Sequence, residues 1–146
     1  MSSSIIVLSP DNIRGSILEK ILSRSGFDVS WFKSHYEAEE ILKKNAPRVV
    51  ILDAKGLRSR AMKLVEKLRN SLPDTVIIAL VDSGAVPASG VEGSARELLL
   101  PEPFDPELIV ARVREIVSSP PDERDSDGEP GKDVFTTSLK QFLKLD

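Results

Sequence analysis

Short apolar runs separated by segments of helical period constrain the fold most strongly. The runs lie at about residues 4–8, 28–32, 48–53, 75–81 and 97–100. Strands that are apolar throughout are typical of parallel sheets covered by helices on both faces. Because amphipathic segments alternate with the runs, the sequence predicts an α/β fold with a doubly wound parallel sheet.

Helix boundaries can be placed from capping residues. The first helix follows an N-cap at Asp11 and ends at Gly26, the second spans about 35–45 after Ser34, and the third spans about 57–71. Helical spacing predicts which apolar side chains of the first two helices face the core: Ile13, Ile17, Leu18, Ile21, Leu22, Ala38, Ile41 and Leu42.

The region between the last two strands breaks the pattern. Residues 83–93 contain three glycines and a proline where a crossover helix is expected, so the fourth helix is predicted to be weak or absent. The last core helix regains clear signals: Asp105 is its expected N-cap, Pro106 takes its first position, and it ends near Ser118.

Length and composition limit the class of protein. A chain of 146 residues with 40% hydrophobic content suits one core, which we place at residues 1–118. It has no cysteine, which excludes disulfides, thiolate zinc sites and thiol nucleophiles. No apolar stretch approaches the roughly 20 residues that span a bilayer, and no signal peptide is evident. We therefore expect a cytoplasmic protein with no membrane partner.

Charge is concentrated at the C-terminal end. Residues 119–146 carry seven acidic and four basic side chains, which accounts for the whole net charge of −3. The rest of the chain is neutral and shows no basic stripe, so nucleic acid is not an expected partner. Residues 119–133 contain no apolar side chain to bury and are predicted to be a disordered acidic linker.

The last residues, 134–146, predict a short amphipathic helix. A helix this short is marginal alone and needs a surface to bind. The sequence leaves open whether it docks on this domain, on a second copy or on another protein, or is a disordered terminus with accidental periodicity. Its apolar stripe consists of Phe135, Leu139, Phe142 and Leu143.

Asp53 is the main candidate for chemistry. It follows four apolar residues and therefore sits at the C-terminal tip of a buried strand, where open α/β sheets place their ligands. The alternative is that Asp53 ends the strand and turns the chain. The single histidine, His35, has no cysteine or second histidine to share a metal with, so no metal site is predicted.

Three segments resemble the receiver domain of bacterial two-component response regulators, over about residues 4–118. The first is the strand ending at Asp53, followed sixteen residues later by the end of the third helix at Arg69; the others are the joint at 25–29 and the turn at 103–108. The resemblance implies a five-stranded sheet of order 2-1-3-4-5 and makes Asp53 the equivalent of the phosphoacceptor.

The resemblance also implies partners for the acceptor that this chain lacks. Receivers use two acidic residues with the acceptor to hold magnesium, and a hydroxyl and a lysine to bind the phosphoryl oxygens. Here the acidic pair falls on Ser9 and Pro10, the hydroxyl on Leu80 and the lysine on Glu102. Glu102 reverses the sign of the charge and should oppose phosphoryl transfer.

The resemblance has implications for two further features. Receivers couple the hydroxyl residue to an aromatic residue in the fifth strand; those positions are Leu80 and Leu99 here, a Leu–Leu pair typical of ordinary core packing. The bond from Glu102 to Pro103 matches a common cis peptide of receivers, although trans stays open.

Substitutes for the missing groups are conceivable. Asp11 could hold magnesium, and Lys55, Arg58 or Arg60 could supply positive charge. The simpler interpretation is that Asp53 pairs with a nearby cation such as Arg58, or with Ser9, or has a raised pKa if it is buried alone.

The leading hypothesis is a pseudo-receiver, a non-enzymatic interaction module without a cofactor that acts independently of its own phosphorylation. Its expected partner is a signalling protein, such as a histidine kinase or an output protein, with a homodimer left open; we expect the contact surface at residues 83–100 and the last helix. The alternative is a receiver phosphorylated on Asp53 with magnesium. A small-ligand sensor is a third option, although no convergent polar groups support it.

Overall fold

The computed structural model describes residues 4–44, 46–57, 60–72, 74–82, 91–92, 97–102 and 105–118. Several sequence predictions lie outside these residues: the acidic linker 119–133, the C-terminal segment 134–146 with its apolar stripe, the pairing of Arg58, and the peptide bond to Pro103.

Five parallel strands form the body of the sheet. They are β1 (Ser4–Leu8), β2 (Asp28–Phe32), β3 (Val49–Asp53), β4 (Val76–Asp82) and β6 (Glu97–Glu102). Their order is β2-β1-β3-β4-β6, which is the predicted order 2-1-3-4-5. The doubly wound parallel fold is therefore confirmed.

A sixth strand extends the sheet beyond the prediction. The two residues of β5 (Val91–Glu92) pair antiparallel with β6 and lie at the sheet edge. They fall in the segment for which a weak or absent crossover helix was predicted, and most of that segment, residues 83–90 and 93–96, lies outside the described part.

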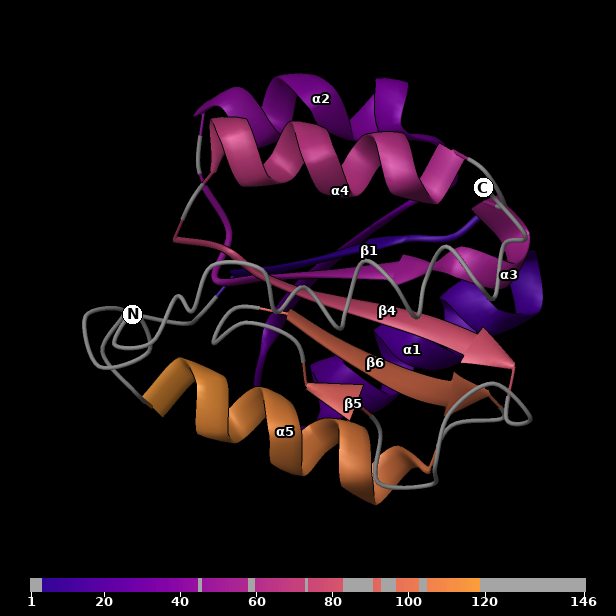
Figure 1. Cartoon of the computed structure of the whole chain (residues 1–146). Helices are drawn as coiled ribbons and strands as arrows, with labels where there is room; N and C mark the ends of the chain where they lie inside the picture. Colours follow the sequence, from indigo (N-terminus) through magenta and orange to yellow (C-terminus); the bar gives the residue numbers. More distant parts are fainter. Residues whose placement is uncertain are drawn as a thin grey trace.

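Helices cover both faces of the sheet. In Figure 1, α2 (His35–Lys44) and α4 (Arg60–Ser71) lie above it, whereas α1 (Asn12–Arg24) and α5 (Pro106–Ser118) lie below. The two apolar clusters of the core fill the spaces between the sheet and these helix pairs. None of the described helices is long and apolar enough to cross a membrane.

Predicted helix caps are present. The carboxylate of Asp11 accepts from the backbone N–H groups of Ile13 and Arg14, and the carboxylate of Asp105 accepts from the backbone N–H of Glu107. At the start of α2 the hydroxyl of Ser34 accepts a long bond of 3.4 Å from the backbone of Glu37. These bonds satisfy backbone donors that the helix itself leaves unpaired.

The predicted third helix begins earlier than expected. The structure describes helix at α3 (Ala54–Leu57), which starts directly after β3, and at α4, which begins at Arg60, with residues 58–59 outside the described part. The early start of α3 has a local cause, because the side chain of Asp53 accepts a hydrogen bond from the backbone of Gly56 and caps the turn.

The inward faces of α1 and α2 differ partly from the prediction. Leu18, Leu22 and Ala38 are buried as expected, but Ile13 is 71% exposed, Ile17 42% and Ile41 40%. On α1 the face toward the sheet is turned to Gly15, Leu18 and Leu22. The reason is steric: the Trp31 ring lies so close to Gly15 that a side chain at that position would collide with it.

Candidate functional site

The C-terminal ends of β1 and β3 bring Ser9 and Asp53 together. The two strands are neighbours, with Leu8 paired to Leu52, so the residues that follow these two lie side by side. Both Ser9 and Asp53 are fully buried. Asp53 stands at the C-terminal end of a buried strand, as predicted, and Ser9, one of the partners that the sequence left open for it, lies beside it.

Three donors hold the carboxylate of Asp53. Its Oδ2 accepts from the hydroxyl of Ser9 at 2.8 Å and from Nε of Arg14 at 2.9 Å, while its Oδ1 accepts from the backbone N–H of Gly56 at 3.2 Å. Hydrogen bonds to an ionised partner are stronger than neutral ones. Asp53 therefore both caps the following turn and forms a buried ion pair, so it is not buried alone.

Arg14 is the functional residue that sequence reasoning missed. It extends from the first turns of α1, and its Nη1 also lies 3.5 Å from Oδ2 of Asp11, so one guanidinium contacts two carboxylates. Of the cations proposed from the sequence, Lys55 and Arg60 are exposed, Nε of Arg60 donates to the carbonyl of Leu57, and Arg58 lies outside the described residues. The available signal was the i,i+3 spacing of Asp11 and Arg14.

Asp11 is committed to the helix start rather than to the buried site. Its Oδ1 accepts from two backbone N–H groups of α1, and its Oδ2 faces Arg14. The backbone N–H of Arg14 is the largest effect that holds the pKa of Asp11 below the ordinary value of 3.8. Burial is second and opposes it, and the guanidinium charge of Arg14 and the backbone N–H of Ile13 lower the pKa further. The carboxylate is therefore ionised at neutral pH.

Gly56 and Pro10 close the space around the carboxylate. A Cβ atom placed on Gly56 would lie 2.8 Å from Oδ2 of Asp53 and 2.9 Å from Cγ of Pro10. Both distances are shorter than ordinary van der Waals contact, so position 56 has no room for a side chain beside Asp53 and Pro10.

Trp31 connects the site to β2. Its Nε1 donates to the backbone carbonyl of Ser9 at 3.1 Å, and the backbone N–H of Ser9 donates to the carbonyl of Phe32 at 3.0 Å. The indole therefore fixes the residue whose hydroxyl bonds Asp53. Because Trp31 is the only tryptophan in the chain, its fluorescence reports on this site.

The positions of the expected hydroxyl and aromatic residue are part of the core. Leu80 pairs with Asp53 in the sheet register and is fully buried in the cluster under α1 and α5. Leu99 is buried in the opposite cluster, together with Val81. Leu80 and Leu99 thus lie on opposite faces, because successive strand residues alternate, and they do not form the implied Leu–Leu pair.

The donor set around Asp53 does not fit a magnesium ion. Magnesium prefers carboxylate and other oxygen ligands in octahedral geometry. Here the Ser9 hydroxyl donates to Asp53, Pro10 has no side-chain donor, and both oxygens of Asp11 are engaged. Among the described residues, no group of three or more His, Asp or Glu side chains could hold a metal. The structure describes the backbone of Glu102 but not its side chain.

Sequence comparison places the chain beside response regulators. No protein-family model matches it. It is 29% identical over 126 residues to the response regulator MprA of Mycobacterium sp. (strain KMS), covering 84% of this chain and 54% of that protein. The MprA protein of Mycobacterium tuberculosis (strain ATCC 25177 / H37Ra) is 28% identical over 119 residues, covering 80% and 51%. The chain therefore spans about half the length of these curated relatives.

Solved structures share the fold. A putative response regulator from Chloroflexus aurantiacus superimposes with a TM-score of 0.68 at 23% identity, covering 82% of this chain and all of that one. A CheY-like receiver domain from Methylobacillus flagellatus gives a TM-score of 0.62 at 14% identity, covering 80% and 99%. With the sheet order and the position of Asp53, these findings show that residues 4–118 have the fold of response regulator receiver domains of the CheY-like type and are similar in sequence to response regulators.

Proposed function

We propose that this chain is a pseudo-receiver, a signalling module that works through protein contact and independently of phosphorylation on Asp53. The observation that carries the proposal is the ion pair between Asp53 and Arg14, 2.9 Å apart, inside a site where Asp53 has no exposed surface. The positive charge that a receiver takes from bound magnesium is supplied here by the chain itself.

Phosphoryl transfer to Asp53 would require several contacts to break. One carboxylate oxygen must be free to attack, yet Oδ2 holds Ser9 and Arg14 and Oδ1 holds the backbone of Gly56. Breaking a buried ion pair costs about 3–5 kcal/mol when no replacement partner is present. Leu80, at the position where a receiver has its hydroxyl, is apolar and offers no hydrogen bond to a phosphoryl oxygen. The cost of breaking these contacts favours an Asp53 whose carboxylate stays bonded to Ser9, Arg14 and Gly56, which we call a locked acid.

A locked acid leaves binding as the mode of action. We infer that the partner is another protein of a two-component pathway, a histidine kinase or an output protein, and that the chain itself is not an enzyme. The curated relatives are about twice as long as the matched region, so an attached or separate output module is compatible with this function.

A phosphate-accepting receiver is the second candidate, and one observation favours it. Arg14 contacts both Asp11 and Asp53, so the two carboxylates lie close enough to share one cation. Replacement of the guanidinium by magnesium would place a divalent ion between them, as the sequence-based alternative requires.

Magnesium titration with Trp31 fluorescence separates the two candidates. The indole is bonded to Ser9, which bonds Asp53, so ion binding at the acid should alter its emission. For a pseudo-receiver we expect magnesium chloride to change the emission no more than sodium chloride at equal ionic strength. A saturable response specific to magnesium, absent in Asp53→Asn, would support the phosphate-accepting receiver instead.

A further inference from the structure

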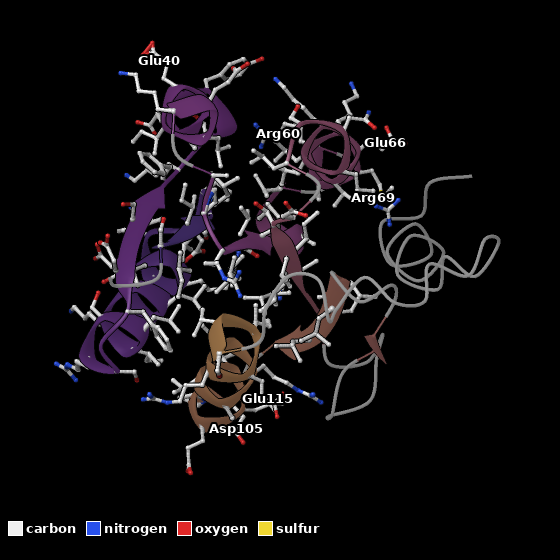
Figure 2. The ribbon with its side chains drawn as sticks, turned by 90° about the vertical axis from the view of Figure 1, so that its left-hand side faces the viewer. Glu40, Arg60, Glu66, Arg69, Asp105 and Glu115 are labelled. Carbon is white, nitrogen blue, oxygen red and sulfur yellow. The ribbon has the colours of Figure 1, made fainter. Side chains whose placement is uncertain are left out.

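We propose that the groove between α2 and α4 is the docking site for this chain's own C-terminal segment, residues 135–145. The proposal concerns a different face from the Asp53 site and does not depend on the state of that acid. In Figure 2, α2 and α4 are seen nearly end-on and lie side by side on one face of the sheet.

The groove is an apolar hollow with a charged bridge. Its volume is about 250 Å³. The ion pair between Lys67 and Glu39, with 2.8 Å between Nζ and Oε1, joins the two helices at the groove. Leu64 and Leu68 are buried, whereas Leu42 and Leu72 are half-buried. The apolar part is lined by Leu42, Leu64, Leu68 and Leu72.

The size of the hollow favours side chains over a small molecule. Typical ligand pockets measure about 300–1,000 Å³ and contain a few convergent polar groups. This one is smaller, and the charged groups that line it, those of Glu39 and Lys67, already bond each other. A hollow lined by leucines between two helices suits one or two apolar side chains of a helix, as in helix-in-groove recognition.

The last turn of α5 and the Leu72 end of the groove both lie at the end of the sheet where β3 and β4 begin. Arg48 Nη2 donates to the carbonyl of Ile116 in the last turn of α5 at 2.7 Å. Pro47, the residue before Arg48, is linked to the groove through Thr75. The Oγ1 of Thr75 donates to the carbonyl of Pro47 at 2.8 Å, and its backbone N–H donates to the carbonyl of Leu72, a lining residue of the groove, at 3.1 Å. The chain therefore leaves α5 at the end of the sheet where β3 and β4 begin, and the Leu72 end of the groove lies at that same end.

The length of the remaining chain matches this placement. Sixteen residues, 119–134, separate the end of α5 from Phe135. A random-coil chain of that length has a root-mean-square span of roughly 22 Å. A folded domain of about 100 residues has a radius of gyration of about 13 Å. A tether of this span gives the C-terminal segment a high effective concentration at sites near the end of α5.

The segment carries the anchors that such a groove requires. Phe135, Leu139 and Phe142 are spaced at i, i+4 and i+7, with Leu143 beside them, which is the spacing used by helices that bind in grooves. Lys140 lies off this stripe and would remain in water. The stripe has four large apolar side chains, more than a short isolated helix can bury by itself.

A spin label on the C-terminal segment tests the proposal in the full chain. Because the chain has no cysteine, Gln141→Cys provides a single attachment site, and Gln141 lies off the apolar stripe. We expect the nitroxide to cause the largest loss of backbone amide intensity at Leu42, Leu68 and Leu72. Amides of α1, such as that of Leu18, lie on the other face of the sheet and should keep their intensity.

Two matched variants and one mixing experiment decide the outcome. Phe142→Ser should abolish the intensity loss at the groove, whereas Lys144→Ser, off the stripe, should preserve it. Broadening that persists in Phe142→Ser, or that centres on another face, would overturn the proposal. So would broadening seen only when spin-labelled chains are mixed with separate isotope-labelled chains, because the segment would then bind a second copy.

Discussion

The Asp53 site and the α2–α4 groove differ in whether their groups already have partners within the described part of the chain. At the Asp53 site both carboxylate oxygens accept hydrogen bonds, and the acid has no exposed surface. In the groove the lining is apolar, and two of its leucines are only half-buried. The place where a receiver performs chemistry is therefore internally satisfied here, while a surface elsewhere has apolar area available for binding.

This contrast predicts where substitutions should cost the most stability. Ser9 and Arg14 satisfy Asp53 from inside the chain, so their contacts with the carboxylate contribute to stability. The groove contributes less to stability, because its leucines are incompletely covered. Substitutions should accordingly cost more stability at the Asp53 site than at the groove.

Replacement of Arg14 should produce the largest loss of stability. Arg14→Met leaves the buried charge of Asp53 without its cation, and we expect the free energy of unfolding to fall by about 2–3 kcal/mol. This is less than for a fully buried pair, because the Arg14 side chain keeps 27% exposure and part of its charge is screened. Urea denaturation at neutral pH measures the change.

Two controls make the Arg14 test specific. Arg24→Met changes an exposed arginine of the same helix and should shift stability by no more than about 0.5 kcal/mol. Adding Asp53→Asn to Arg14→Met should recover part of the loss, since the unpaired charge is then removed. Equal effects of Arg14→Met and Arg24→Met would contradict a buried ion pair.

Gly56→Ala should destabilise the protein by an intermediate amount. The added methyl group would collide with Oδ2 of Asp53 and with the ring of Pro10, and overpacking of this kind costs about 1–3 kcal/mol. Trp31 emission should shift as well, because displacement of Asp53 moves Ser9. Lys63→Ala on the neighbouring helix α4 is the control. An unchanged unfolding midpoint would show that the site is more open than this packing implies.

Leu72→Ala should have a smaller effect than any change around Asp53. A buried leucine replaced by alanine costs about 2–5 kcal/mol, but Leu72 is half-buried, so we expect about 1 kcal/mol. Leu68→Ala, at a buried position of the same groove, is the comparison and should fall in the full range. If Leu72→Ala costs as much as Leu68→Ala, then Leu72 is already covered and the described groove is not available.

The pH dependence contributed by Asp11 should be the smallest effect. Its folded pKa lies below 3.8, so its contribution to stability is present above that value and is lost as pH falls through the folded pKa. Between about pH 4 and pH 2, Asp11→Asn should therefore lose stability less steeply than the native chain. Asparagine keeps the helix cap and removes only the charge. Identical slopes in acid would contradict the assigned role of Asp11.

The sequence predicted the fold well because strand and helix periodicities are local. The five parallel strands and the caps at Asp11 and Asp105 are confirmed. The early start of α3 was missed, since it depends on Asp53 bonding Gly56. The exposure of Ile13 was missed for a similar reason, because the contact of Trp31 with Gly15 turns α1.

The candidate site was predicted in part. The burial of Asp53 and its bond to Ser9 follow from adjacent strand ends, which sheet order fixes. Arg14 could not be selected, because its reach to Asp53 depends on how α1 is oriented over the sheet rather than on any motif. Arg58, the cation named from the sequence, lies outside the described residues.

The most direct test of a locked acid is intact-mass spectrometry after incubation with an acyl-phosphate donor and magnesium. The account predicts that the mass of the native chain stays unchanged while a phosphorylatable receiver in the same tube gains one phosphoryl group. A stoichiometric phosphoryl adduct on the native chain that is absent in Asp53→Ala would contradict it, and would show that Arg14 and Ser9 release Asp53 during phosphorylation.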